Sequence, residues 1–345
     1  MEKLPALGKI HAEFFDRVIY PRLGARDASV IVAPRHGVDF GVIEMGDRVM
    51  VMSTDPFFIA RELGLRKAAW FAVHIIASDV AVSGIPPRYL SIDLNLPPEM
   101  TEPELELMWK TVHSECARLG IAVVTGHTAR YAGCSYPMVG GATVMGVGRR
   151  SELIVPKPCT GDLVLVSKGP AIEATGLMAA YFSTFLQKKY GATFARKAQG
   201  IFYQMSTVKD ARLAAAVGGV TAMHDATECG VIGGLYEMAA HSGVGLELDL
   251  DQVPVPDVVA RSCQYFGMDP WKSISEGTLL ATVRPDKAPA VIRALKREGI
   301  PASVAGRIVP ARSGLHMRVN GRRTAMEHPR VDPFWGAFAK EMSNK

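Results

Sequence analysis

The segment that most constrains the fold is AAWFAVHIIASDVAVSGIPP, at residues 68–87. It is almost continuously apolar, yet it contains His74 and Asp79. An unpaired carboxylate is costly to bury, so it is normally neutralised, hydrogen-bonded or bound to a cation. Three interpretations follow: a transmembrane helix, a core helix with one satisfied polar residue, or a helix that presents a metal ligand to a cleft.

The membrane interpretation is the weakest of the three. The segment reaches spanning length only by including His74, Ser78 and Asp79, and it ends in Pro86–Pro87. There is no second candidate span, and the start of the chain lacks the apolar run and cleavage site of a signal peptide. The five cysteines include no C-x-x-C pair, which argues against a disulfide framework or structural zinc. We therefore expect a cytoplasmic protein that does not bind membranes.

Length and charge limit the remaining classes. A chain of 345 residues exceeds the size at which one core keeps growing, so two domains are expected. The net charge of +5 is spread along the chain without a Lys/Arg run. This distribution argues against nucleic acid as the principal partner and suits an anionic small molecule.

The hydrophobic patterns predict two halves of mixed α and β structure. A break in the pattern at 150–160 favours one domain over 1–155 and another over 156–345. Neither half shows a strict βαβαβ succession, so we predict an α+β fold. A hairpin is expected around Gly46–Asp47, with its second strand ending at Asp55. The expected helices cover 4–24, 68–83, 101–120, 171–182 and the glycine-rich stretch after Asp225, and the expected strands include 87–97, a strand from 121 running into a glycine-rich loop, 138–148, 162–169, 244–255 and 275–283.

Four aspartates stand close to glycines or at the ends of apolar runs: Asp39, Asp55, Asp79 and Asp225. A single aspartate in such a place is commonly a turn or cap residue. Four in one chain indicate oxygen ligands for Mg²⁺, with glycine-rich loops that could hold phosphate groups. Such a combination is typical of phosphoryl transfer. No G-x-x-x-x-G-K-[ST] motif and no G-x-G-x-x-G after a strand is present.

The ordered motifs GVDFGV, STDPFF, SDVAVSGIPPRYLSIDLNLP, GHTARY, SKGPAIEATGLMA, HDATECGVIGGLYEMAAHSGVGLELD and SEGTLLATV resemble the AIR synthase (PurM) superfamily over residues 8–310. The HypE-like branch is the most similar, including relatives without a C-terminal cysteine. The resemblance implies a two-domain fold that dimerises through the sheet of its N-terminal domain, with ATP and Mg²⁺ in the cleft. HypE-like enzymes activate a carboxamide oxygen as its phosphate, whereas thiamine-monophosphate kinases transfer phosphate to their substrate.

The resemblance also implies site residues. Asp39, Asp55 and Asp79 match the acids that hold Mg²⁺ and phosphates, and Asp225 and His127 are the candidate catalytic residues. The other matched or nucleotide-binding positions are Gly37, Gly126, Thr128, Lys168, Glu173, Thr227, Glu276 and Gly277. Residues 126–128 correspond to a strand-end Gly-Asp-Thr loop.

Several positions depart from the family pattern. The motif Gly37–Gly41 has one acid fewer than many relatives, and His127 replaces an acid. Imidazole is a poorer Mg²⁺ ligand than carboxylate, although it could act as a base. Glu228 and Cys229 stand where Arg and Gly are frequent, and no cysteine follows Cys263, so we expect no reaction on the chain's own tail.

Three hypotheses follow: a HypE-like ATP-dependent enzyme with an unknown small-molecule or protein-borne acceptor, a small-molecule kinase, or a non-catalytic dimeric scaffold. Among the remaining polar residues, we expect His74 in the core and Cys229 as a buried thiol. His224 could face either the core or the cleft.

Overall fold

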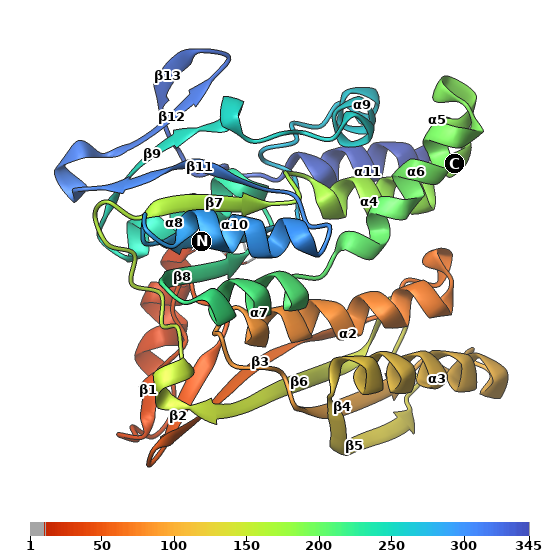
Figure 1. Ribbon diagram of the computed structural model, residues 1–345. Coiled ribbons are helices and arrows are strands. Elements are labelled where there is room, and N and C mark those ends of the chain that lie inside the picture. The colour runs from red at the N-terminus through yellow and green to blue at the C-terminus, as the bar shows by residue number, and fades with distance from the viewer. Residues whose placement is uncertain (1–9, 11, 345) are drawn as a thin grey trace.

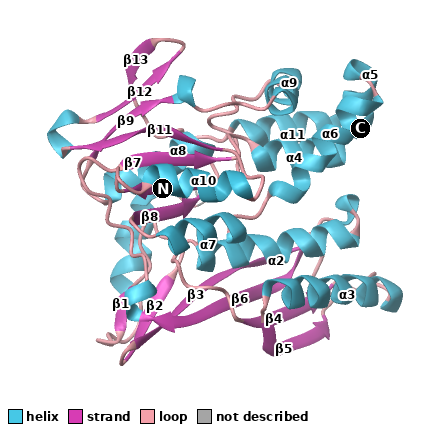
Figure 2. Cartoon of the chain, viewed as in Figure 1, coloured by secondary structure: helices cyan, strands magenta, loops and turns pink. Residues whose placement is uncertain are grey.

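The protein is described by a computed structural model that covers residue 10 and residues 12–344 (Figure 1). Two mixed sheets form its frame, with helices between and around them (Figure 2). The first sheet has the strand order β1-β2-β3-β6-β4-β5, with β4 and β5 parallel. Its strands are β1 (Val30–Val32), β2 (Gly41–Met45), β3 (Arg48–Phe58), β4 (Tyr89–Leu96), β5 (Ala122–Arg130) and β6 (Met138–Arg149).

The second sheet has the order β13-β12-β9-β11-β7-β10-β8. Its strands are β7 (Leu163–Ser167), β8 (Val220–Asp225), β9 (Gly245–Asp249), β10 (Leu279–Val283), β11 (Ala302–Val309), β12 (Leu315–Val319) and β13 (Arg322–Ala325). The α-helices are α1 (Ala12–Phe14), α2 (Leu65–Ala81), α3 (Glu102–Leu119), α4 (Ile172–Tyr181), α5 (Ser183–Tyr190), α6 (Ala192–Ile201), α7 (Val208–Val217), α8 (Gly230–His241), α9 (Asp257–Phe266), α10 (Ala288–Arg297) and α11 (Pro333–Ser343).

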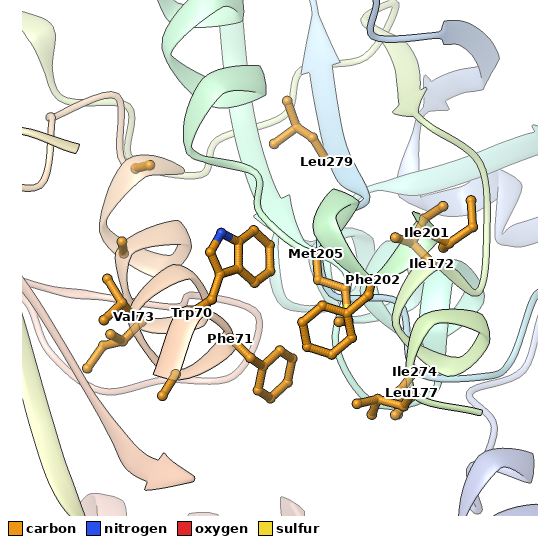
Figure 3. Packing of buried hydrophobic residues seen from close by; sticks show 14 of the residues in the cluster. Trp70, Phe71, Val73, Ile172, Leu177, Ile201, Phe202, Met205, Ile274 and Leu279 are labelled. Carbon is orange, nitrogen blue, oxygen red and sulfur yellow. The ribbon is translucent and has the colours of Figure 1, made fainter. Parts of the chain in front are cut away.

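Helix α2 lies between the two sheets and contacts both (Figure 1). It packs on β3 and β6 of the first sheet, and on α7 and β8 of the second half. Trp70 and Phe71 point toward Phe202 and Met205, which belong to the second half (Figure 3). A helix that is apolar all round is buried on all sides, which accounts for the composition of 68–87. No helix within the described residues is long and apolar enough to cross a membrane.

Most predicted elements are confirmed. Thr101 and Glu104 form the expected capping box at the start of α3, and Gly120 ends this helix in a left-handed conformation. The hairpin turns at Gly46–Asp47 as predicted. Of the helix expected at 4–24, residues 12–22 are helical, in one short α-helical and two irregular turns, and its start lies outside the described residues.

Two predictions are wrong. Strand β3 continues past Asp55 to Phe58. Its pairing with β2 stops at Met52 of β3, which lies opposite Gly41, but its pairing with β6 goes on. Pro56 has no N–H to donate, and it is tolerated there because β2 no longer pairs with this part of β3. Residues 126–128 form no loop and lie inside β5, paired with Ile92–Leu94 of β4.

Candidate functional site

Asp79 faces the first sheet from near the C-terminal end of α2. Its Oδ2 accepts a hydrogen bond of 2.9 Å from Ser53 Oγ on β3. The carboxyl group is buried, and this burial raises its pKa well above the ordinary value. Asp55 raises the pKa further through its charge and a shared hydrogen bond, and the charges of Asp39 and Asp225 act in the same direction. Burial and these neighbouring acids therefore favour the protonated form of Asp79.

Asp39 joins the site from the loop between β1 and β2. Its Oδ2 lies 2.7 Å from Nδ1 of His224, which is buried on β8 of the second sheet. This bond connects the two halves of the chain across the site. It also places His224 beside the predicted acids. Of the two orientations expected for His224, core or cleft, the structure therefore shows the one that faces the site.

Asp225 follows His224 at the end of β8 and is completely buried. Thr207 Oγ1 donates to its Oδ2 at 3.1 Å, and the N–H of Gly277 donates to its Oδ1 at 3.2 Å. Burial raises the pKa of Asp225 to about 6 against the lowering effect of a hydrogen bond from Glu276. The charge of Asp39 adds to the rise. Asp225 is thus held by the turn that precedes β10.

Glu276 and Glu173 extend this acidic group in the second half. Burial, together with the charges of Asp225 and Glu173, raises the pKa of Glu276 well above its ordinary value. Burial raises the pKa of Glu173 to about 8, and its Oε2 accepts from the Glu276 N–H at 3.2 Å. Glu276 Oε2 is buried without a hydrogen-bond partner among the described residues. This unsatisfied oxygen is costly unless a cation or another donor reaches it.

Five carboxyl groups thus interact across the junction of the two halves: Asp39, Asp55, Asp79, Asp225 and Glu276. They cannot all be ionised without a cation, because like charges at close range oppose ionisation. Carboxylate oxygens are the ligands that Mg²⁺ prefers, so their chemistry fits this metal. In the described residues, no three His, Cys, Asp or Glu side chains already converge as ligands. The acids instead contact one another or His224, as Asp39 does.

Lys168 is engaged by the protein itself. Its Nζ lies 3.0 Å from Asp210 Oδ2 and donates to the carbonyl oxygens of Ser206 at 2.8 Å and Gly277 at 2.6 Å. Its backbone adopts a left-handed φ of 59°, which is uncommon for a side chain of this kind. This arrangement fixes the turn that carries Glu276, so Lys168 acts here as a positioning residue.

The remaining predicted positions of the second half serve the packing around the site. The carbonyl of Thr227 accepts from the N–H groups of Gly230 and Ser275. Cys229 is buried and has a left-handed φ of 63°, and its N–H donates to Asp332 Oδ2 at 2.7 Å. Glu228 accepts from Trp335 Nε1 at 3.2 Å. Glu228 and Cys229 therefore contact the start of the C-terminal helix α11.

Residues of the first half that lie outside the acidic group have other contacts. A Cβ on Gly37 would approach Glu237 O to 3.1 Å, so Gly37 allows close packing against α8. Strand β5 is largely exposed, and there His127 Nε2 lies 2.9 Å from the hydroxyl of Tyr131. The structure therefore does not join Gly37 or residues 126–128 to the carboxylates. His74 is buried as expected, with Nδ1 2.8 Å from Ser206 Oγ.

Three residues of the site escaped the sequence interpretation: Ser53, Thr207 and Asp210. Ser and Thr are common in every loop and strand, and their partners are far away in the chain. Asp210 lies in α7, where its sequence neighbours indicate only a helix. No local signal identifies these residues.

Two family models match this chain. The model of the AIR synthase related protein, N-terminal domain, matches residues 37–148, and that of the C-terminal domain matches residues 160–317. The chain belongs to the AIR synthase-related (PurM) family, with its two-domain α+β fold.

Several proteins of this family resemble the chain over most of its length. A Methanocaldococcus jannaschii protein provisionally named for hydrogenase expression/formation is 24% identical over 94% of this chain and 96% of its own. Carbamoyl dehydratase HypE of Escherichia coli is 25% identical over 85% of each chain. A crystal structure of E. coli HypE covers 82% of this chain and 87% of its own with a TM-score of 0.68. A HypE structure in complex with ATP is 20% identical, covers 94% and 93%, and has a TM-score of 0.65.

Proposed function

We propose that this protein is an ATP- and Mg²⁺-dependent enzyme of the HypE-like branch that activates a carboxamide or carboxylate oxygen by phosphorylation. The observation that carries the proposal is the set of carboxyl groups contributed by both halves, held protonated or paired without a metal. The relatives named carbamoyl dehydratase, and the HypE structure with ATP, support it.

Asp39, Asp55 and Asp79 would hold the metal, which would neutralise charge on the transferred phosphate. The contacts of these acids with one another and with His224 support this assignment. A bound cation would take over the carboxylate oxygens and displace the proton or the histidine from them. Glu276 is a further candidate, since its Oε2 lacks a partner among the described residues. The metal would thus offset the like charges that, together with the larger effect of burial, raise the pKa values of Asp79 and Glu276.

Asp225 would face the acceptor. Its pKa of about 6 places it in the range where a carboxyl group can take up and release a proton near neutral pH. Gly277 N–H and Thr207 Oγ1 fix its orientation. His127 is the second group proposed for proton transfer. Because it lies on the exposed strand β5, it could act only if a second protein surface covered this strand.

A facing surface would arise from a homodimer, which we propose forms through the first sheet. Val123 and Val124 on β5 are 40% and 53% exposed, and Met138 at the start of β6 is 50% exposed. These exposed apolar side chains, together with the open edge of β5 in the first sheet, support the proposed interface.

Calorimetric titration with a non-hydrolysable ATP analogue, with and without Mg²⁺, tests the proposal. We expect metal-dependent binding, followed by release of free phosphate when ATP and a carboxamide acceptor are supplied. Phosphate retained on the acceptor would instead identify a small-molecule kinase. Absence of binding under both conditions would contradict the proposal and favour the scaffold.

A further inference from the structure

A cavity of about 740 Å³ lies at the seam between the two halves, apart from the acidic group. Its walls come from the ends of β3 and β6, the segment 84–88, residues 151–154, and α7 with the turn that follows it. Val147, Ile154 and Val220 supply apolar lining. The volume is that of a small-molecule site.

Four arginines line this cavity: Arg48, Arg88, Arg149 and Arg212. Arg48 and Arg149 are direct partners on neighbouring strands. Arg88 pairs its N–H with the Met145 carbonyl on β6, so the strands hold all three side chains at one end of the first sheet. Arg212 reaches the cavity from α7 in the second half.

Within the described part of the chain none of the four guanidinium groups has a carboxylate oxygen within 4.0 Å, although the charge of Arg212 contributes to lowering the pKa of Glu298. The single acid of the lining is Glu152, and its Oε2 already accepts from the Arg149 backbone N–H at 2.8 Å. The neighbouring Arg150, in contrast, is paired with Glu44. Unpaired like charges around one cavity repel, and an anion would relieve this repulsion.

A second cavity of about 650 Å³ shares Gly84, Pro86 and Arg212 with the first. It is lined by Trp70 and by Tyr203, which is 56% exposed. The two cavities therefore adjoin, with four arginines around the first and aromatic rings beside further basic residues, Arg118 and Lys209, in the second. A ligand in this groove would have an anionic part and an apolar or aromatic part.

We propose that this groove binds a small organic molecule that carries several phosphate groups, with its phosphates at the four arginines. The planar guanidinium group binds phosphate oxygens in pairs, which makes phosphate a better match than a single carboxylate. The four arginines are exposed and line one cavity of limited size, which favours a small molecule over nucleic acid, whose backbone needs an extended basic strip. The arginine end of the groove is separate from the proposed ATP site, because the cavity there is lined by none of the five carboxylates and by none of the predicted nucleotide-binding residues.

Calorimetric titration with inorganic triphosphate tests the arginine end of the groove. EDTA in the buffer removes divalent metal, so the acidic group repels the probe and does not bind it. We expect saturable binding of one triphosphate per chain, weakened at least about tenfold in Arg149→Gln/Arg212→Gln, since each loses charge-assisted hydrogen bonds. Arg297→Gln/Arg312→Gln removes the same charge from exposed positions outside the groove and should bind normally, as should Asp79→Asn.

Three results would overturn the proposal: no saturable binding, equal weakening in the two arginine pairs, or loss of binding in Asp79→Asn. Tighter, arginine-dependent binding of a single-stranded RNA 12-mer would also overturn it, in favour of nucleic acid. Thermal melting of each variant checks that it is folded. If Arg149→Gln/Arg212→Gln is unfolded, Arg48→Gln/Arg88→Gln replaces it, and the same loss of triphosphate binding is expected.

Discussion

Asp39 and His224 lie 185 positions apart in the sequence, yet Oδ2 of one stands 2.7 Å from Nδ1 of the other. Asp39 lies in the loop before β2 of the first sheet and His224 lies on β8 of the second, so the bond joins the two halves at the acidic group. A cation held by Asp39 would compete with His224 for the Asp39 carboxylate. Metal binding would therefore change the hydrogen bonding of His224. The predictions below concern the acids on both sides of this contact and the segments that support them.

Replacing Asp79 by Asn should leave the fold intact and abolish Mg²⁺-dependent ATP binding. Because burial and neighbouring acids keep Asp79 protonated, the neutral amide matches its metal-free state. We expect affinity for the ATP analogue with Mg²⁺ to fall at least about 100-fold, since even partners of metal ligands contribute up to that factor. Calorimetry measures the loss. Wild-type affinity in this variant would exclude Asp79 from the metal site.

The metal-free protein should lose stability as the pH rises from 7 to 9. Glu173, with a folded pKa of about 8, binds more protons folded than unfolded, and so do Asp79 and Glu276. Stability is therefore lost as the pH rises through the folded pKa. His74 and His241 have lowered pKa values, so their destabilising protonation lies on the acidic side of this window.

Urea denaturation in EDTA at pH 7 and pH 9 measures this loss. Glu173→Gln removes the group that titrates near pH 8 and should reduce the slope. Addition of Mg²⁺ should reduce it as well, because a bound cation favours the ionised carboxylates. A stability that rises over this interval would contradict the protonated state of these acids.

Lys168→Met should destabilise the protein by about 3–5 kcal/mol, because it leaves Asp210 buried without its cation. Lys168→Met/Asp210→Asn removes both charges and should recover part of this loss. Urea denaturation provides the free energies. A stable single variant that loses only nucleotide binding would instead support the ligand-binding role expected for Lys168 from the sequence.

Asp332→Ala should lower stability by about 1–2 kcal/mol through loss of a helix cap. Its Oδ1 caps α11 at the Phe334 N–H, and its Oδ2 accepts from Cys229 N–H. Lys340→Gln, at an exposed position of the same helix, is the control and should melt like the wild type. Equal melting temperatures for all three proteins would show that α11 is not anchored by this carboxylate.

Val124→Glu should convert the proposed dimer into a monomer, because it places a charge in the middle of the exposed strand β5. Light scattering coupled to size-exclusion chromatography measures the mass. Val331→Glu is the control. Val331 is 77% exposed and lies just before α11, outside the first sheet, so this variant should keep the wild-type mass. A wild-type protein that is monomeric at micromolar concentration would contradict the proposed dimer.

The sequence predicted well whatever depends on local patterns. The capping box of Thr101 and Glu104 involves residues three apart, and the apolar run at 68–87 correctly indicates a buried helix. The loop at Gly126 was wrong because glycine has another use there. A Cβ at this position would lie 2.4 Å from Ile92 O, so glycine permits a close approach of two strands.

The contacts within the site were harder to predict, since they depend on packing between the halves. Asp39, Asp79 and Asp225 were found from their local context, and all three lie at the junction. Their partners were not, because nothing near Lys168 in the sequence points to Asp210, and nothing near Asp79 points to Ser53. These pairings follow only when α2 and α7 have been placed in space.

The position of α2 between the sheets has a consequence for folding. Trp70 and Phe71 belong to an apolar cluster that also contains Phe202 and Met205, so one core serves both halves. Separation of the halves would expose this core to water, at about 25 cal/mol for each Å² of apolar surface. The two halves should therefore melt in a single cooperative transition, and a fragment that ends before β7 should aggregate instead of folding alone.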